Sequence, residues 1–342
     1  MNSKLSNKTG LKFWAPLGIC LLMLAASAPA RAAIEGQPVT AVPSWLGLFG
    51  VAIRPDGSIY AVGSKAALMV STDHGKTWVM RTLKERNPID DLFQDRDLYS
   101  IRFAPDGKTG WIVGEDGLIL KTTDGGDTWT EQDSGNPNSL FKIFVIDDQN
   151  AVAVGDNAAI VRTTDGGAHW TTIKSPKDVT LFDVTFLDKQ NGWSVGEFSS
   201  IFKTTDGGQT WTLVYGGNTT DFTIGPFLTV IFTDPTHGTV AGLSGGTMIT
   251  SDGGKTWTAQ QLPDQSGSYA TALDSANKKL WLGGTGGKMF DQASNGTWQS
   301  PDRTSFHDIT DMAFDGNVGV AVGLNGTILV SQNAGDQWQA VQ

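Results

Sequence analysis

The chain has 342 residues, a net charge of −10 and a single cysteine. This length is enough to bury a core that is stable without disulfides, and one cysteine excludes a disulfide framework and cysteine-rich metal sites. The acidic balance disfavours nucleic acid and anionic lipid headgroups as partners.

Residues 1–32 have the three parts of a secretory signal peptide. They are a basic start, an apolar stretch at 13–26, and Ala-Arg-Ala at 30–32 as the cleavage site. We expect a mature chain that begins near Ala33. Cleavage removes four positive charges and no negative ones, so the mature net charge becomes −14. The alternative is an uncleaved N-terminal anchor. Cys20 follows Ile19, which does not fit a lipoprotein signal.

One phrase, written TTDGGQTW at 204–211, then recurs along the chain in five full copies and two degraded ones. Each copy ends in a tryptophan, and a glycine stands eight residues before each copy. The tryptophans are Trp78, Trp129, Trp170, Trp211, Trp257, Trp298 and Trp338. The glycines are Gly63, Gly114, Gly155, Gly196, Gly242, Gly283 and Gly323. A fixed period of roughly 40–50 residues indicates a solenoid or a propeller.

The copy around 204–211 shows what one repeat contains. Short runs bounded by Gly, Asp and Asn predict hairpin-linked strands. The predicted strands are 181–186, 193–196, 200–205 and 210–214. Four strands repeated seven times predict an all-β fold, a seven-bladed β-propeller of four-stranded antiparallel blades. It is expected to occupy residues 33–342 as a single domain.

The recurring phrase falls in the hairpin between the third and fourth strands. Its Ser or Thr and its Asp can hydrogen-bond the turn, its second glycine supplies a positive φ, and its Trp can pack one blade on another. We expect structural roles for Asp73, Asp124, Asp165, Asp206 and Asp252 and for Trp78, Trp129, Trp170, Trp211 and Trp257. In the degraded copies, Asn333 keeps an acceptor whereas Ala293 loses it, so blade six should have the weakest turn.

The pattern S/T-x-D-x-G-x-T-W resembles the Asp-box (BNR-like) repeat of sialidases and other secreted propellers. In that family the box is a turn remote from the active site. The longer phrase NGWSVGEFSSIFKTTDGGQTWT at 191–212 is similar to the photosystem II stability and assembly factors of thylakoids and their relatives in non-photosynthetic bacteria.

That resemblance implies a non-catalytic propeller that binds a partner membrane-protein complex during its assembly or stabilisation. It implies no cofactor, no nucleic acid and no insertion into the membrane, and we expect a monomer. The expected location is the periplasm, or the thylakoid lumen in a photosynthetic organism.

Two links between blades, at 80–99 and 215–229, are longer than the others. They are expected on the face opposite the boxes, and functional residues concentrate on loops over a rigid scaffold. The candidate partner-binding residues are Arg81, Lys84, Arg86, Phe93, Arg96, Tyr99, Phe222 and Phe227. The resemblance implies an arginine patch, which here Arg81, Arg86 and Arg96 can supply. The alternatives are a solvated loop for the first link and apolar residues tucked onto blade five for the second.

The alternative function is a sialidase-like glycoside hydrolase. Such a site needs three arginines that converge from different blades. The arginines expected on the face opposite the boxes are Arg81, Arg86, Arg96 and Arg303, and three of these four share one loop. Acidic residues of the turns between second and third strands could form a carboxylate pair, although acids are also ordinary turn residues. These turns hold Lys65, Glu115, Asp116, Asp156, Glu197 and Asn325. The four histidines lack metal-binding spacing, so we predict no metal site.

Overall fold

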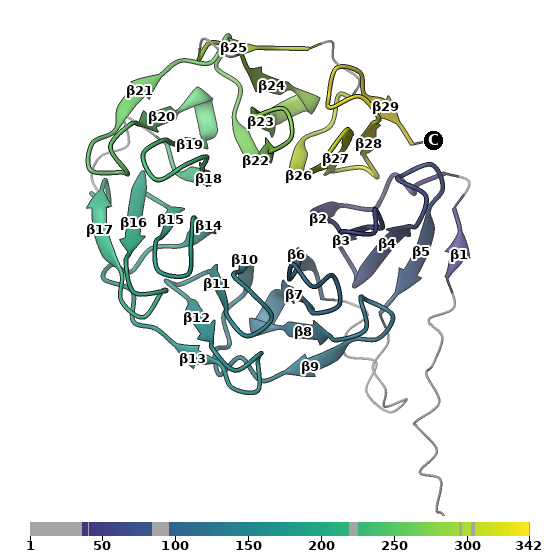
Figure 1. The fold of residues 1–342 in the computed structure, drawn as a ribbon, viewed down its shortest axis with the longest axis horizontal. Helices are drawn as coiled ribbons and strands as arrows, with labels where there is room; N and C mark the ends of the chain where they lie inside the picture. Colours follow the sequence, from purple (N-terminus) through teal and green to yellow (C-terminus); the bar gives the residue numbers. More distant parts are fainter. Residues whose placement is uncertain are drawn as a thin grey trace, which may run out of the picture. The chain divides into compact units, whose positions relative to one another are not determined.

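Seven antiparallel sheets follow one another around a central axis (Figure 1). The computed structural model describes residues 36–39, 41–83, 96–218, 225–293, 296–301 and 305–341. In each sheet the first strand of the repeat lies nearest the axis and the fourth lies at the outside. The predicted seven-bladed β-propeller of four-stranded blades is therefore confirmed.

Blade one holds five strands: β1 (Gln37–Pro38), β2 (Leu48–Ile53), β3 (Ile59–Gly63), β4 (Ala67–Ser71) and β5 (Val79–Thr82). Blades two to four hold β6 (Leu98–Phe103), β7 (Gly110–Gly114), β8 (Ile119–Thr122), β9 (Thr130–Gln132), β10 (Leu140–Val145), β11 (Ala151–Gly155), β12 (Ile160–Thr163), β13 (Thr171–Thr172), β14 (Leu181–Phe186), β15 (Gly192–Gly196), β16 (Ser200–Thr204) and β17 (Thr212–Tyr215).

Blades five to seven hold β18 (Phe227–Phe232), β19 (Gly238–Gly242), β20 (Thr247–Thr250), β21 (Thr258–Gln260), β22 (Ser268–Asp274), β23 (Lys279–Gly284), β24 (Met289–Gln292), β25 (Trp298–Gln299), β26 (Ile309–Asp315), β27 (Val318–Gly323), β28 (Ile328–Ser331) and β29 (Gln339–Ala340). In the described residues the helices are three short 3-10 turns, η1 (Glu115–Gly117), η2 (Leu243–Gly245) and η3 (Thr285–Gly287). The strands expected in blade four agree with β14 to β17 within two residues.

The ring closes between blades one and seven without an exchanged strand. Blade seven is built entirely from β26 to β29, and the N-terminal strand β1 instead pairs with β5 at the outer edge of blade one. The seam is held by packing and by hydrogen bonds across it. The Gly326 N–H donates to the Leu46 carbonyl at 2.6 Å, and the Thr310 hydroxyl donates to the Leu48 carbonyl at 2.5 Å.

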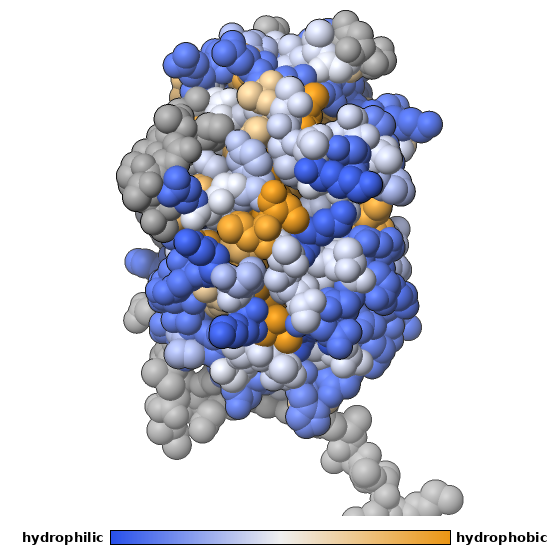
Figure 2. Space-filling model, turned by 90° about the vertical axis from the view of Figure 1, so that its left-hand side faces the viewer, coloured by the Kyte–Doolittle hydropathy of each residue, from blue (hydrophilic) through white to orange (hydrophobic). Residues whose placement is uncertain are grey.

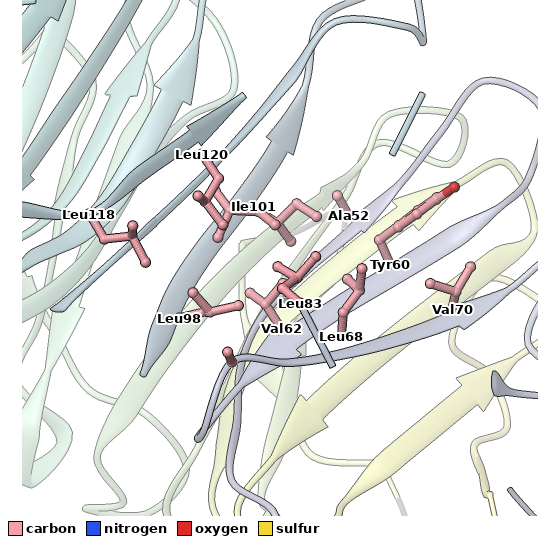
Figure 3. Packing of buried hydrophobic residues seen from close by; sticks show 12 residues of the cluster. Ala52, Tyr60, Val62, Leu68, Val70, Leu83, Leu98, Ile101, Leu118 and Leu120 are labelled. Atoms are coloured by element: carbon pink, nitrogen blue, oxygen red, sulfur yellow. The ribbon is translucent and has the colours of Figure 1, made fainter. Parts of the chain in front are cut away.

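The core consists of seven hydrophobic clusters, one at each boundary between adjacent blades. Figure 3 shows the cluster between blades one and two, where Val62 and Leu68 of blade one face Leu98 and Ile101 of blade two. Second strands are completely buried in every residue of β3, β7, β11, β15 and β19. Each blade is thus stabilised by the blades on both sides, so no blade is expected to be stable alone.

Aromatic side chains join neighbouring blades next to the boxes. Phe232, the last residue of β18, stacks on Trp193 of blade four with ring centroids 3.6 Å apart. It also meets Trp257 of its own blade edge-on at 6.0 Å. Trp281–Phe314–Trp338 repeats this stacked and edge-on arrangement, and Tyr60–Phe103–Trp129 and Phe144–Phe186–Trp211 form similar trios whose first two rings are tilted. The box tryptophan of each blade therefore packs against the preceding blade.

The five complete boxes share one pattern of hydrogen bonds, except that in blade three the His169 ring replaces the last threonine hydroxyl. In blade four the Thr204 hydroxyl donates to Asp206 Oδ1 at 2.8 Å and accepts the Gly208 N–H at 2.9 Å. The Thr210 N–H donates to Asp206 Oδ1 at 2.9 Å, and the Thr210 hydroxyl donates to Oδ2 at 2.6 Å. In blade seven Asn333 replaces the aspartate and still accepts the Ser331 hydroxyl and the Gln337 N–H.

Two details of the boxes differ from the sequence-based expectation. The turn has two consecutive left-handed residues rather than one: His74 at φ 59° and Gly75 at φ 86° in blade one. Blade six is also shifted by one residue, because Gly284, not Gly283, pairs with the first residue of its innermost strand. Its hairpin from Gln292 to Trp298 is one residue shorter than the hairpin from Thr122 to Trp129 in blade two. The one-residue shift and the shorter hairpin cancel, so the spacing from Gly283 to Trp298 equals that of the other blades in the sequence.

We predict that Asp206→Ala lowers the free energy of unfolding by roughly 1–3 kcal/mol, because the donors of the turn lose their acceptor. Asp206→Asn should lose less, since Asn333 performs the same backbone-accepting role in blade seven. Chemical denaturation of the purified variants measures both. An Asp206→Ala protein that unfolds at the wild-type denaturant concentration but fails to bind its partner would show that the box is functional rather than structural.

Candidate functional site

One side of the propeller carries both the links between blades and the turns between second and third strands; we call it the link face. In blade one the Ser64 N–H donates to the Gly47 carbonyl at 2.9 Å, and an equivalent bond joins turn to link in every blade. The boxes instead bond the turns between first and second strands, as Gly207 N–H does to the Gln190 carbonyl at 2.9 Å. The boxes therefore lie on the opposite side, the box face, as expected.

The glycine that ends each second strand is required by close approach on the link face. A Cβ on Gly63 would lie 1.9 Å from the Gly47 carbonyl oxygen, and one on Gly196 would lie 2.1 Å from that of Thr180. No side chain fits at such distances. The repeated glycine thus allows the link to press against the second strand, which fixes where the innermost strand begins.

Every innermost strand has a register shift at its second residue, at its link-face end. Such bulges redirect a side chain out of the regular alternation. In blades one to four the bulged residues are aromatic and half-buried, and we call them the mouth row: Phe49, Tyr99, Phe141 and Phe182. Their successive ring centroids are 5.7, 5.3 and 6.2 Å apart. In blades five to seven the same position holds Leu228, Tyr269 and Thr310.

The residues that follow the mouth row include a buried charge cluster that connects distant blades. Asp311 of blade seven is completely buried, and it binds Lys142 Nζ of blade three at 2.9 Å and Arg102 Nη1 of blade two at 3.1 Å. It also accepts the Val51 N–H of blade one at 2.9 Å. Burial alone would raise the pKa of Asp311, but the charges of Arg102 and Lys142 outweigh it and hold the pKa at about 2.

Asp183 of blade four plays a similar part on the other side of the ring. It accepts the Val230 N–H at 2.9 Å and the Thr229 hydroxyl at 3.0 Å, both from blade five. Burial raises the pKa of Asp183, and Lys142 and these hydrogen bonds offset only part of that effect. The two aspartates therefore tie blades together near the axis while differing in the stability of their charged forms.

Large exposed hydrophobic side chains gather on the link face. Among the described residues these are Trp45, Val214, Leu243, Phe306 and Leu324, and all except Val214 lie in link-face loops. Trp45 is 60% exposed and Phe306 is 76% exposed. Val214 belongs to the outer strand β17. Figure 2 shows the outer edge of the propeller on the side of β17, where the surface is mostly hydrophilic with a few apolar groups near its middle.

The structure places only some of the candidate partner-binding residues. Arg81 is half-buried in β5, and Arg96 lies 3.5 Å from Glu131 in an ion pair at the foot of the first long link. Tyr99 belongs to the mouth row, and its hydroxyl donates to Glu115 at 3.4 Å. Lys84, Arg86, Phe93 and Phe222 lie outside the described residues.

Phe227 corrects the sequence-based expectation. It begins β18 and is completely buried, because it lies in the cluster between blades four and five beside Tyr215. An innermost strand starts there instead of an exposed link, so this phenylalanine is part of the core and cannot contact a partner. The mouth row, in contrast, was missed apart from Tyr99, although the recurrence of an aromatic residue after the first strand residue was visible in the sequence.

Comparison with known proteins agrees with the repeat and the fold. The family model described as photosynthesis system II assembly factor YCF48 matches residues 80–176 and 168–224, and the BNR/Asp-box repeat model matches residues 69–80. The chain is an Asp-box propeller that resembles the photosystem II assembly factors.

Curated relatives of this Asp-box propeller match over short segments. A photosystem II assembly lipoprotein Ycf48 of Synechococcus sp. (strain CC9902) is 34% identical over 71 residues, covering 21% of this chain and 19% of that protein. The photosystem II stability/assembly factor HCF136 of Arabidopsis thaliana is 29% identical over 108 residues, covering 30% of this chain and 26% of that protein. The matches thus span about a fifth to a quarter of the length of these relatives.

Solved structures match over nearly the whole propeller. A structure titled "YCF48 bound to D1 peptide" has a TM-score of 0.69 at 22% identity and covers 86% of this chain and 96% of that chain. A GH74 enzyme from Niastella koreensis has a TM-score of 0.71 at 15% identity and covers 88% of this chain and 55% of that chain. At these identities the likeness shows the fold alone.

Three of the four acidic turn residues considered for glycoside hydrolysis are bound within the propeller. Glu115 accepts the Asp97 N–H at 2.9 Å, Glu197 accepts the Thr180 N–H at 2.9 Å, and Asp156 accepts the Thr180 hydroxyl at 3.1 Å. These contacts fix the links on their turns, which is a structural use of carboxylates. Of the remaining turn residues, Lys65 lies over the Trp45 ring at 5.7 Å and Asn325 bonds His307 at 3.0 Å.

The described arginines do not converge on one point of the link face. Arg54 and Arg162 donate to the carbonyls of Gly107 and Gly207 on the box face, whereas Arg102 is bound to Asp311 near the axis. Arg303 lies outside the described residues. Within the described part of the chain, no group of three or more His, Cys, Asp or Glu residues is arranged to bind a metal, and no helix is long and apolar enough to cross a membrane.

We predict that Asp311→Ala lowers the free energy of unfolding by about 3–5 kcal/mol, because Arg102 and Lys142 then lack their counter-charge. Since ionised Asp311 is stabilised by folding, its contribution is present above about pH 4 and is lost as the pH falls toward 2. Asp311→Asn keeps the shape of the side chain and removes its charge. Chemical denaturation as a function of pH should therefore show that the difference in unfolding free energy between wild type and Asp311→Asn becomes smaller as the pH falls from about 4 toward 2.

The matched control is Asp315→Ala, an exposed carboxylate at the end of the same strand. It should leave the unfolding free energy nearly unchanged. Equal stabilities of the Asp311 and Asp315 variants at pH 7 would contradict a role for the charge cluster in holding blades one, two, three and seven together.

Proposed function

We propose that this chain is an exported, non-catalytic propeller that binds a protein partner through its link face. It acts as an assembly or stability factor for a membrane-protein complex. The observation that carries the proposal is the position of the large exposed hydrophobic side chains, which among the described residues lie in link-face loops except for Val214. Exposed aromatic side chains are energetically dominant in protein interfaces and are otherwise costly on a soluble surface.

The relatives support a protein as the partner. The curated relatives carry assembly-factor names, and one similar structure is described as YCF48 bound to a D1 peptide. The binding residues proposed for this chain are Trp45 together with the long link at 80–99, whose described ends hold Arg81, Arg96 and Tyr99. In a photosynthetic organism the partner complex is photosystem II; elsewhere it is another envelope complex of the same compartment.

The absence of catalysis is part of the proposal. Glu115, Asp156 and Glu197 of the link-face turns already accept hydrogen bonds from backbone N–H groups or a hydroxyl, which leaves these three carboxylates poorly suited to proton transfer. Hydrolysis of a sialoside or a glucan by the purified protein would refute this part and favour a glycoside hydrolase, a function that proteins of this fold also perform.

Export predicts a processed N-terminus. The basic start, the apolar stretch and the Ala-Arg-Ala site of residues 1–32 should direct cleavage, so the mature protein should begin near Ala33 and lie in the periplasm or lumen. Strand β1 begins at Gln37, which leaves a short connection after that site. N-terminal sequencing of the protein from its native host measures this, and a sequence that starts at Met1 would overturn it.

Variants of the link face should weaken partner binding without affecting stability. The partner is first captured from the native envelope by mild crosslinking and identified, and the purified pair is then titrated. Trp45→Ala and Arg86→Ala should each cost about 2 kcal/mol of binding energy, or roughly thirty-fold in affinity, if they are interface hot spots. Neither belongs to the repeat pattern, so their melting temperatures should match wild type.

The matched control is Lys255→Ala in the box of blade five, whose side chain is exposed on the box face. Its affinity should equal that of wild type. If Trp45→Ala, Arg86→Ala and Lys255→Ala all bind the partner as wild type does, the link face is not the docking surface.

A further inference from the structure

The mouth row is one-sided in both shape and charge. Its four rings come from blades one to four, whereas blades five to seven place Leu228, Tyr269 and Thr310 at the same position. The turns between second and third strands that adjoin the row in blades two to four read Glu-Asp-Gly at 115–117, Asp-Asn-Ala at 156–158 and Glu-Phe-Ser at 197–199. These turns hold four carboxylates and no Lys or Arg.

The carboxylates lie close enough to the row to act on it electrostatically. Glu115 bonds the Tyr99 hydroxyl at 3.4 Å. Burial raises the pKa of Tyr99, and the charges of Glu115, Asp97 and Asp116 raise it further. A phenol whose ionisation is opposed by three neighbouring carboxylates marks a region of negative potential. Nearby Arg96 is already paired with Glu131 and does not cancel it.

Two cations lie beneath the row, and buried carboxylates hold them in place. Arg102 and Lys142 both bind Asp311, whose carboxylate is ionised, and Asp183 lies within reach of their charges. A ligand that lies on the row therefore meets aromatic faces and, at the adjoining turns, carboxylates that form no ion pair with the described residues. Aromatic faces beside carboxylates attract side chains that combine an apolar stem with a cationic end, as Lys and Arg do.

The spacing of the rings matches an extended chain. Their centroids are 5.3 to 6.2 Å apart, and alternate side chains of an extended peptide are about 6.6 Å apart. We propose that the mouth row, with the carboxylates of the adjoining turns, docks an extended basic segment of the partner protein in which Lys or Arg alternates with apolar residues. This inference rests on the proposed function, since it names the part of the partner that the link face receives.

The test uses three fluorescein-labelled peptides and the mature protein. The first is Gly-Leu-Arg-Leu-Lys-Leu-Arg-Gly; the second and third carry Glu and Gln at every basic position. Fluorescence anisotropy should show binding of the basic peptide, weaker binding of the Gln peptide and none of the Glu peptide. Raising the salt concentration from about 0.05 M to about 0.5 M should weaken binding of the basic peptide, because the charges involved are solvent-accessible.

Two variants locate the contact. Asp116→Asn removes one carboxylate and keeps a residue that tolerates the left-handed φ of 52° found there. Phe141→Leu removes the middle ring and keeps an apolar side chain. Each variant should lower the affinity for the basic peptide about two- to five-fold, which is the range of a single exposed cation–π or charge contact. The controls are Asp315→Asn on the box face and Val214→Ala on the outer strand β17, which should bind as wild type does.

The proposal is overturned if the Glu peptide binds as well as the basic one, or if Asp116→Asn and Phe141→Leu behave like the two controls. Its failure can be told apart from failure of the proposed function. If the protein binds no peptide but still binds its partner, and Trp45→Ala weakens that partner binding, only the proposal of a basic segment is refuted. Partner binding insensitive to every link-face variant would sink the proposed function.

Discussion

The fold depends on closing a ring whose first and last blades share no strand. Blade seven is complete from C-terminal residues, and β1 extends blade one outward instead of crossing the seam. Besides a few hydrogen bonds to the backbone, the seam is held by side chains. They are a buried cluster that includes Leu46 and Val320, and the carboxylate of Asp311 that reaches three other blades. A buried ion pair is a costly means of closure, but it fixes which blades meet near the axis.

The innermost strands contribute both to closing the ring and to the proposed binding surface, through neighbouring residues. The third residue of an innermost strand supplies Lys142, Asp183 or Asp311 to the interior, whereas the bulged second residue supplies an aromatic ring to the link face. The bulge separates the two roles, since it turns one side chain outward without disturbing the next. Because the box face is occupied by turns that bond one another, the link face is where this chain can vary without losing its fold.

Acidity distinguishes this chain from the arginine-rich surface that its resemblance implies. The described arginines are spread over the box face, the interior and the link face, and the turns that adjoin the mouth row in blades two to four are acidic. The same scaffold thus presents a different charge, which changes the class of partner segment it attracts. The box chemistry is unaffected by that change, since the boxes do not use the residues concerned.

The sequence by itself determined the blade count, the strand order within a blade and the face on which the boxes lie. Those features follow from local rules, because Gly, Asp and Trp recur at fixed spacing wherever a turn needs a left-handed residue, an acceptor and an apolar wedge. The tertiary structure alone decided the rest. Phe227 belongs to the core because a strand starts one residue after Pro226, and Asp311 meets Arg102 across more than two hundred residues of chain. Blade six is one residue out of step, and the mouth row exists only because bulges in four separate blades aim their rings at one another. Such contacts are set by how the ring closes, and no local spacing encodes them.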